Sequence, residues 1–330
     1  MQFSRFPRVK LASLPTPLEE MSNLSKALGG PRLFVKRDDS TGLGFGGNKV
    51  RKLEFLMGEA LEKKADTVIT TGGVQSNHAR QTAAAAKKLN LKSILVLRGE
   101  KPKLYKGNLL LDTLLGAEVR FVRASNSQEA DQIAYEIASQ IEENGGIPYV
   151  IPTGGSVPTG CLGYVVAALE IVSQIEQKGM EIDYAVVANG SSGTQTGLTL
   201  GFKALHSGIK VIGMSVNHSK EELERRILQL GNQTAEKLEI DTQLEQEDII
   251  VYDDYVGPGY TVPTQECIEA IKLLARTEGL FLDPIYTGKA MAGLIDLIKK
   301  GVLKKGQNVL FMHTGGTPAL FAEEEVFRDA

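Results

Sequence analysis

Seven short apolar runs alternate with longer segments of helical periodicity along this chain, and this alternation constrains its fold most strongly. Continuous apolar runs are typical of parallel strands that are buried on both faces of a sheet. The segments between them supply the helical crossovers that parallel strands require. The sequence therefore predicts an α/β fold. The expected strands cover residues 66–71, 92–99, 117–122, 148–152, 183–189, 210–216 and 308–316, and the expected helices cover residues 48–64, 78–89, 106–115, 127–143, 159–177, 221–238, 264–278 and 288–300.

Length and charge limit the size of the fold and its partners. A chain of 330 residues is too long for one hydrophobic core, so we expect two domains, or one domain with a large excursion. The 37 basic and 40 acidic residues give a net charge of −3, which favours neither a nucleic-acid nor a membrane-surface partner. The charge-dense stretch 220–248 is interpreted as a solvated helical face without a functional role.

Cysteine and hydropathy patterns indicate a cytoplasmic protein. Cys161 and Cys267 are far apart and lack CxxC spacing, so we expect neither a disulfide framework nor a zinc ribbon. No apolar run reaches the length expected of a bilayer span, and the first twenty residues lack the apolar core of a signal peptide. The four histidines show neither an i, i+4 pair nor HExxH, and GxSxG is absent. Metal chemistry and acyl-transfer hydrolysis are therefore not expected.

Glycines form four clusters where expected strands pass into helices, at residues 41–49, 71–77, 189–197 and 313–318. Parallel α/β sheets bind ligands at this edge, because helix N-termini there leave backbone N–H groups free. In the third cluster, NGSSGTQTG, glycines allow close approach and hydroxyls add donors, which predicts a phosphate-binding cup. The Walker spacing is absent, and no GxGxxG fingerprint follows the first expected strand. A turn that only caps a helix is the alternative.

Lys49 is the candidate reactive amine. It begins a helix directly after Gly46, Gly47 and Asn48. An ammonium at a helix N-terminus is electrostatically unfavourable, so the pKa of Lys49 should fall, as an imine-forming lysine requires. Lys52 competes for this role one turn later, and an ordinary surface lysine would produce the same pattern.

The second cluster ends in the polar tetrad Gln75-Ser76-Asn77-His78, which opens an alanine-rich helix. Small side chains there leave room for a bulky group. Ser76 or Asn77 is a candidate N-cap, and a capping side chain can also donate to a ligand. His78 alone does not indicate a catalytic base.

These clusters, in this order, resemble the fold-type-II pyridoxal-phosphate enzymes of the tryptophan-synthase-β superfamily. The resemblance is to the branch that holds 1-aminocyclopropane-1-carboxylate deaminase and D-cysteine desulfhydrase. Matching segments cover nearly the whole chain, and the most specific are GGNKVRKLE and DPIYTGKAMAG. The resemblance implies two three-layer α/β/α domains with the cofactor in the cleft between them, and a homodimer. The large domain would comprise residues 1–51 and 160–330, and the inserted small domain residues 52–159, with a hinge near Gly154 and Gly155.

The resemblance also implies roles for individual residues. Lys49 would hold pyridoxal phosphate covalently, and Asn77 would bond its phenolic oxygen. Ser76, with the backbone around Asn77 and His78, would hold the substrate carboxylate. Tyr260 and Tyr286 would approach the substrate and the ring, either to assist the leaving group or only to pack at the wall. The phosphate would be bound by Gly190, Ser191, Ser192, Gly193 and Thr194.

Two departures distinguish members of the branch. The ring-opening deaminases have DPxYEGK, whose carboxylate faces the pyridine nitrogen, and HLGG near the end; this chain has Thr287 and Thr314 there. A threonine hydroxyl can only hydrogen-bond to that nitrogen and lets it stay neutral, which favours β-elimination. We therefore expect D-cysteine as the substrate. L-cysteate is the runner-up, for which no sulfonate-binding group is identified, and the deaminase reaction is disfavoured. A phosphate- or nucleotide-ligand binding protein without covalent chemistry is the alternative from another class.

Overall fold

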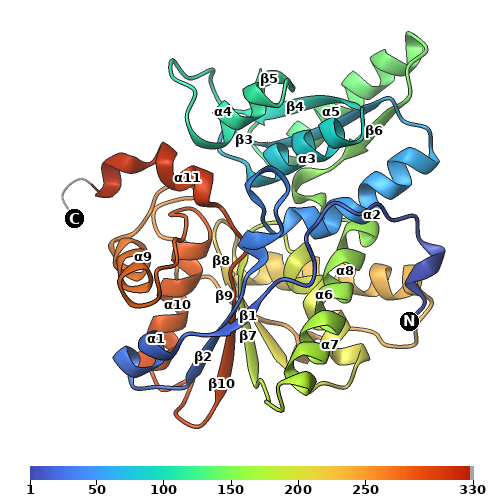
Figure 1. Ribbon diagram of the computed structural model, residues 1–330. Coiled ribbons are helices and arrows are strands. Elements are labelled where there is room, and N and C mark those ends of the chain that lie inside the picture. Colours follow the sequence, from blue (N-terminus) through green and yellow to red (C-terminus); the bar gives the residue numbers. More distant parts are fainter. Residues whose placement is uncertain (328–330) are drawn as a thin grey trace.

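The apolar runs form the strands of two separate sheets in the computed structural model, which describes residues 1–327 (Figure 1). The smaller sheet has the order β5-β4-β3-β6 and the larger one β1-β2-β10-β7-β8-β9; only β1 and β2 pair antiparallel. The strands are β1 (Leu18–Glu20), β2 (Arg32–Lys36), β3 (Thr67–Gly73), β4 (Lys92–Arg98), β5 (Glu118–Val122), β6 (Pro148–Ile151), β7 (Tyr184–Asn189), β8 (Lys210–Ser215), β9 (Ile250–Tyr252) and β10 (Asn308–Met312).

Helices cover both sheets, as predicted. They are α1 (Ser22–Leu28), α2 (Lys49–Glu62), α3 (Asn77–Lys88), α4 (Gly107–Leu114), α5 (Ser127–Glu143), α6 (Pro158–Gln177), α7 (Gly193–Ala204), α8 (Lys220–Leu238), α9 (Gln265–Glu278), α10 (Thr287–Lys299) and α11 (Thr317–Ala322). Short 3-10 helices are η1 (Phe3–Arg5), η2 (Asp38–Ser40), η3 (Leu43–Phe45), η4 (Thr153–Gly155), η5 (Gln246–Asp248) and η6 (Glu324–Phe327).

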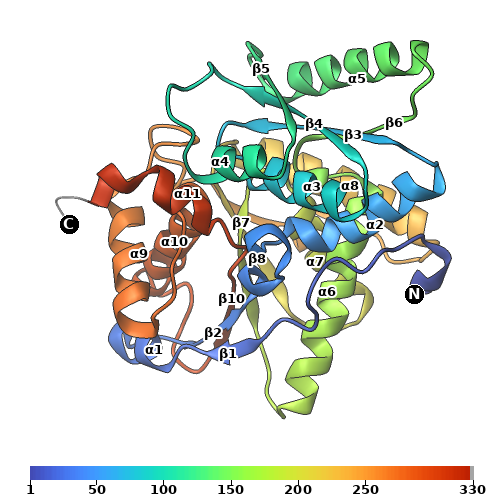
Figure 2. The ribbon, with the colours of Figure 1, turned by 45° about the horizontal axis from the view of Figure 1, so that its top comes forward.

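Alternate residues of β4 face opposite helical layers, which explains its continuous apolar run. Ile94 and Val96 belong to the cluster that packs on α5. Leu95 and Leu97 belong to the cluster that packs on α3 and α4. Figure 2 shows α5 on one side of the smaller sheet and these two helices on the other. Burial on both faces is the property that the sequence pattern predicts.

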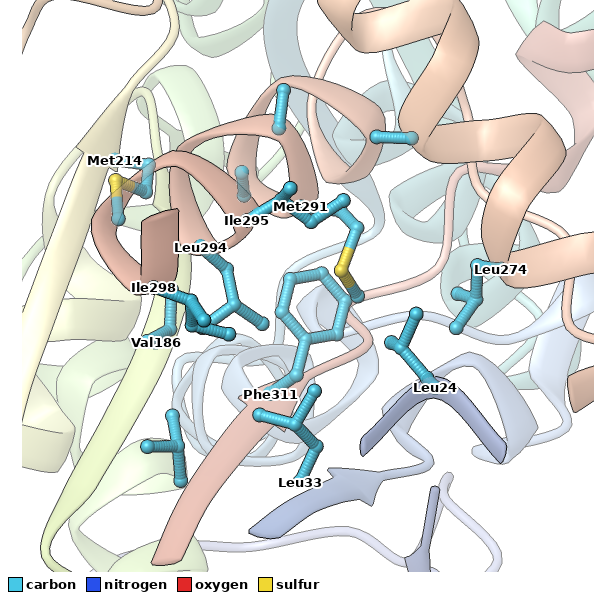
Figure 3. Packing of buried hydrophobic residues seen from close by; sticks show 14 of the residues in the cluster. Leu24, Leu33, Val186, Met214, Leu274, Met291, Leu294, Ile295, Ile298 and Phe311 are labelled. Atoms are coloured by element: carbon cyan, nitrogen blue, oxygen red, sulfur yellow. The ribbon is translucent and has the colours of Figure 1, made fainter. Parts of the chain in front are cut away.

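The larger sheet repeats this arrangement. Phe311 of β10 lies in the middle of one cluster, with Leu24 of α1, Leu274 of α9 and Met291 of α10 around it (Figure 3). Its neighbour Leu310 packs on the opposite face, in the cluster formed with α6 and α7. Both sheets are therefore the centres of three-layer α/β/α arrangements, which confirms the predicted fold class.

Helix α6 corrects one expectation. Its 20 residues are long and apolar enough to cross a membrane by length and composition, whereas no run of that length was expected. More than half of the qualifying window is buried against the rest of the protein. The helix packs on α2 and α7, and Tyr164 and Glu170 carry polar groups into that interior. Its apolar character is that of a core helix.

A buried ion-pair network fixes α2 against the larger sheet. The Arg51 guanidinium donates to both oxygens of Asp38, at 2.8 and 2.9 Å, and to both oxygens of Glu170, each at 2.9 Å. Tyr164 donates to Asp38 at 2.5 Å, and Lys36 contacts Glu170 at 2.5 Å. Arg51 lies between the two lysines that the sequence singles out, so this network sets where they project.

The expected ranges omit β1, β2, β9, α1, α7 and α11; for α7 the sequence predicts only that a helix follows the third glycine cluster. Two of these strands have only three residues, and α11 has six, so their periodicity is too short to read. The strands of the smaller sheet lie within residues 67–151. The domain boundaries at 51/52 and 159/160 stay a prediction, as does a hinge at Gly154 and Gly155, both buried with positive φ.

Candidate active site

A cavity of about 710 Å³ lies between the two sheets, at the carboxyl ends of their strands. All four glycine clusters contribute to its wall, because parallel strands bring these turns to one edge. Gly193, Thr287 and the competing amine Lys52 are not part of the wall. The predicted residues that line the cavity are Lys49, Ser76, Asn77, His78, Gly190, Ser191, Ser192, Thr194, Tyr260, Tyr286 and Thr314.

Lys49 is the first residue of α2, as the sequence predicts. The preceding loop lies so close to α3 that a Cβ on Gly47 would be 2.5 Å from the Gln81 Nε2. The Lys49 Nζ lies 3.4 Å from the position that a Cβ on Gly154 would take, at the cavity wall. Burial, reinforced by the Lys52 ammonium, holds the pKa of Lys49 well below its usual value. This favours a neutral, nucleophilic amine.

Lys52 lies behind the predicted phosphate cup and has a separate role. Its Nζ donates to the Gly154 carbonyl and the Ser156 hydroxyl, both at 3.1 Å. It lies 2.6 Å from the position of a Cβ on Gly193, so only glycine leaves room there. Burial lowers the pKa of Lys52 to about 8. The sequence shows the lysine but not that it faces this turn, because that depends on how α2 and α6 pack.

The cup is the turn from β7 into α7. Ser192 adopts a φ of +70° there, and its N–H donates to the Asn189 side chain at 3.0 Å. The Ser192 hydroxyl is buried without a partner among residues 1–327. The Thr194 hydroxyl accepts from Asn48 at 2.9 Å, which links the cup to the start of α2. Unpaired donors at a helix N-terminus beside a lysine suit a phosphate group.

Helix α3 presents its N-terminus to the cavity. Ser76 is the N-cap, and its hydroxyl accepts from the Ala79 N–H at 3.1 Å, which leaves the hydroxyl proton free to donate. The Asn77 side-chain oxygen is buried without a partner in the described part of the chain. The His78 ring is 2.8 Å from the Thr70 hydroxyl, and burial holds its pKa well below the usual value. His78 is therefore a neutral wall residue.

Tyr260 and Tyr286 meet edge to face, with ring centroids 5.8 Å apart, and their hydroxyls form a hydrogen bond. Tyr260 belongs to the loop before α9, and Tyr286 precedes α10. Burial raises the pKa of both phenols. The pair therefore holds its protons at neutral pH and can donate one into the cavity.

The two threonines differ in position. The Thr287 hydroxyl donates to Asp283 at 2.7 Å, is fully buried, and does not line the cavity. The buried Asp283 carboxylate also accepts the N–H groups of Ile285, Tyr286 and Thr287. The Thr287 hydroxyl is therefore one of four donors that satisfy this carboxylate. The expectation that position 287 faces a bound ring is therefore wrong for this side chain. Thr314 lines the cavity, where its hydroxyl can face a bound ring.

Helix α8 corrects a second expectation. The stretch 220–248 was interpreted as having no functional role, yet Glu222 and Arg226 line the cavity. They form an ion pair at 2.5 Å, and the His218 ring contacts Glu222 at 3.0 Å. The segment also packs Leu223 and Ile227 into a core cluster. Its amphipathic pattern does not reveal which domain its polar face meets.

Among residues 1–327, no group of three or more His, Cys, Asp or Glu side chains could hold a metal ion. The chemistry that the cavity offers is instead a neutral lysine amine, an anion cup backed by a second lysine, and two protonated tyrosines. These groups fit a ligand that carries both a phosphate and a carbonyl carbon able to condense with the amine.

Comparison with known proteins agrees with this chemistry. Residues 9–315 match the family described as "Pyridoxal-phosphate dependent enzyme". D-cysteine desulfhydrase of Klebsiella pneumoniae (strain 342) is 47% identical over 324 residues, covering 97% of each chain. A protein of Pyrococcus abyssi (strain GE5 / Orsay), provisionally named 1-aminocyclopropane-1-carboxylate deaminase, is 46% identical over 96% of this chain and 94% of its own. A crystal structure of an ACC deaminase homologue, 44% identical, superposes with a TM-score of 0.92 over 99% of this chain and 97% of its own.

Proposed function

Since this chain belongs to the family of pyridoxal-phosphate dependent enzymes, we propose that it is a lyase that removes a β-substituent from a small amino acid. The proposed reaction converts D-cysteine and water into pyruvate, hydrogen sulfide and ammonia. The observation that carries the proposal is the Lys49 amine, which has a lowered pKa and reaches the cavity wall close to Ser191 of the cup. The named relatives include a D-cysteine desulfhydrase and a provisionally named deaminase at nearly equal identity, so the choice of substrate is argued from the site.

The residues of the cavity divide into groups that would hold each part of the cofactor. Lys49 would hold it covalently, and Asn77 would bond its phenolic oxygen. Thr314 is the hydroxyl available to the ring nitrogen. The phosphate would lie in the cup of residues 190–194 with Lys52 behind it. When bound, pyridoxal phosphate supplies an aldehyde carbon for amines and a ring that withdraws electrons from Cα.

The protein's own groups supply binding and proton transfer. The Ser76 hydroxyl and the N-terminus of α3 would hold the substrate carboxylate. The Lys49 Nζ, neutral once free, takes the proton from Cα. Tyr260 and Tyr286 lie at the cavity wall, where a phenol proton can reach the departing group. Water must then add to convert the remaining three-carbon unit into pyruvate and ammonia.

We propose elimination of sulfide, and not opening of a cyclopropane ring, as the reaction of this enzyme. Thr314 offers a hydroxyl, not a carboxylate, to the cofactor ring, and Thr287 is occupied by Asp283. A neutral ring nitrogen withdraws fewer electrons, and opening a cyclopropane demands more withdrawal than expelling sulfide. Sequence identity to the two named relatives is nearly equal, so this argument rests on the site alone.

Substitution of Lys49 tests the proposal directly. Lys49→Ala should lose both the visible absorbance of bound cofactor and pyruvate formation, because no other amine replaces it at the cavity wall. Lys52→Gln is the comparison, since its amine faces the cup and its loss should weaken cofactor binding while keeping the absorbance band. Absorbance that survives in Lys49→Ala and disappears in Lys52→Gln would contradict the assignment.

A substrate panel separates the candidate reactions. Keto-acid release should be measured with D-cysteine, L-cysteine, L-cysteate, β-chloro-D-alanine and 1-aminocyclopropane-1-carboxylate. We expect D-cysteine to give the highest kcat/KM. Turnover of the cyclopropane amino acid above that of D-cysteine would overturn the substrate proposal and favour the name of the Pyrococcus relative.

We also propose that the enzyme works as a cytoplasmic homodimer. Exposed apolar side chains lie on α4 and α11, which pack on each other, and Leu114 and Phe321 are 73% and 67% exposed. Such side chains are typical of a surface that another protein covers. Both cysteines are free and buried, in keeping with a reducing compartment. The net charge of −3 favours neither nucleic acid nor an anionic membrane as partner.

A further inference from the structure

Arg98 is a cation at the cavity wall whose charge the rest of the described chain leaves uncompensated. It ends β4, and its guanidinium forms no ion pair or side-chain hydrogen bond with any of residues 1–327. The other arginine at the wall, Arg226, is paired with Glu222 at 2.5 Å. Arginine side chains that face a cavity without a carboxylate partner are suited to anionic ligands.

Strand register shows where the Arg98 side chain points. Arg98 is the register partner of Gly73 in the parallel pair β3 and β4. Register partners on adjacent strands project from the same face of a sheet. A Cβ on Gly73 would lie 3.7 Å from the Tyr260 ring. The Arg98 side chain therefore leaves the sheet on the side where Tyr260 and Tyr286 meet.

Neither carboxylate at the wall, Asp131 or Glu222, forms an ion pair or hydrogen bond with Arg98 in the described part of the chain. Asp131 accepts the hydroxyl and the N–H of Thr153, at 3.0 and 3.1 Å, and also the Thr71 hydroxyl. Glu222 is shared between Arg226 and His218. Burial raises the pKa of Tyr260, and the positive charge of Arg98 partly opposes that shift, in keeping with the strand register that places the two groups on one side. The missing partner is thus expected to come from a ligand.

We propose that Arg98 determines specificity for an anionic β-substituent, which makes the substrate class 2-amino acids that carry a thiolate or sulfonate on Cβ. This inference rests on the proposed lyase function. In the proposed function, the cup and Lys52 bind the cofactor phosphate, and the N-terminus of α3 binds the substrate α-carboxylate. Arg98 is therefore left for a third anionic group. Arg98 lies beside the two tyrosines, where the group on Cβ would have to leave.

The step balances with the groups present. The Cα–H bond breaks, its proton goes to the Lys49 Nζ, and its electron pair forms the Cα–Cβ double bond. The Cβ–S bond breaks, and its electron pair leaves with sulfur. Cysteate releases SO₃²⁻, and cysteine releases HS⁻ after its bound thiolate has taken a proton from the Tyr260–Tyr286 pair, which regains it from solvent. Negative charge on the departing sulfur therefore grows in either case. A guanidinium in place before the reaction stabilises that charge.

A matched pair of non-eliminating amino acids tests the proposal by binding. D-aspartate and D-asparagine have nearly the same shape and differ in side-chain charge; both enantiomers of each should be titrated into the holoenzyme, with the change in cofactor absorbance as readout. Wild type should bind aspartate about 10- to 150-fold more tightly than asparagine, the range of one charged hydrogen bond. Arg98→Gln should lose this preference, and Arg98→Lys should keep part of it.

Three controls make the result decisive. Alanine carries only the α-carboxylate, so its affinity should be unchanged in Arg98→Gln. Arg123→Gln removes the same charge from a residue that is 90% exposed and outside the cavity, and should retain the preference. An Arg98→Gln variant that still prefers aspartate, or that weakens alanine equally, overturns the proposal. Keto-acid release by wild type is scored separately, so failure of the lyase function is recognised independently.

Discussion

Asp112 of α4 is fully buried, and neither carboxylate oxygen has a hydrogen-bond partner among the described residues. Burial raises its pKa to about 7, although the charge of Arg80 opposes the shift. Arg80 itself donates to the carbonyls of Gly44 and Gly46 in the loop that precedes Lys49. An ionised Asp112 therefore costs stability next to a loop that positions the reactive amine.

The sign of its pH effect follows from the two pKa values. An unfolded aspartate has a pKa near 3.9, so between about pH 4 and pH 7 the folded carboxyl is protonated while the unfolded one is ionised. Unfolding then releases a proton, and the free energy of unfolding falls as pH rises through this window. Asp112→Asn removes the effect and should raise the free energy of unfolding by about 1–3 kcal/mol more at pH 8 than at pH 5.

Chemical denaturation at the two pH values measures this difference. Asp254→Asn, at an exposed aspartate, is the control and should show no pH-dependent gain. An equal gain from Asp112→Asn at both pH values would contradict the account.

Single residues were predictable where a motif names them. Lys49 begins a helix after a glycine pair, and the local sequence alone shows this. Its partner Lys52 was visible only as a competing amine, because the role depends on the approach of Gly193 from a residue far along the chain. Arg98 and Asp283 were not singled out, since a strand-end arginine and a helix-start aspartate have ordinary neighbours in sequence.

At the scale of elements, the crossing of α2 and α6 places both lysines. A Cβ on Gly163 would lie 2.8 Å from the Lys52 backbone nitrogen and would clash with the Arg51 carbonyl. The two helices therefore touch backbone to backbone at this residue. The Arg51 pairs with Asp38 and Glu170 then hold α2 in that position.

Gly163→Ala should push α2 away from α6. We expect a loss of about 1–3 kcal/mol in the free energy of unfolding, typical of an overpacked core, together with weaker cofactor binding. Denaturation and cofactor titration measure the two effects. Gly259→Ala is the matched control, because its Cβ would meet nothing closer than Val262 at 3.9 Å. Equal stability of the two variants would show that α2 can shift freely.

The sequence predicts these elements unevenly. Strands such as β3 and β4 are buried on both faces, so their apolar runs are unmistakable. β2 contains the buried Lys36, which pairs with Glu170 far along the chain, and its pattern is therefore less clear. The part of the cavity wall that α8 supplies with Glu222 and Arg226 depends on tertiary packing that local periodicity does not encode.

For the whole molecule, the proposed dimer makes a simple prediction. Leu114→Lys places a charge on the apolar surface of α4 and should convert a dimer into monomers, as measured by sedimentation. Val302→Lys is the control, since Val302 follows α10 and is likewise exposed. A wild-type protein that sediments as a single chain, or a Leu114→Lys variant that remains dimeric, would contradict the proposed interface.

The order of the strands has a consequence for biosynthesis. β10 lies between β2 and β7, so β2 has no partner on that side until almost the entire chain has left the ribosome. The smaller sheet closes from residues 67–151 alone and can assemble while translation continues. During synthesis the smaller sheet can therefore be complete while β1 and β2 still lack β10, the partner strand of β2 in the larger sheet. Chaperone demand should peak in that interval.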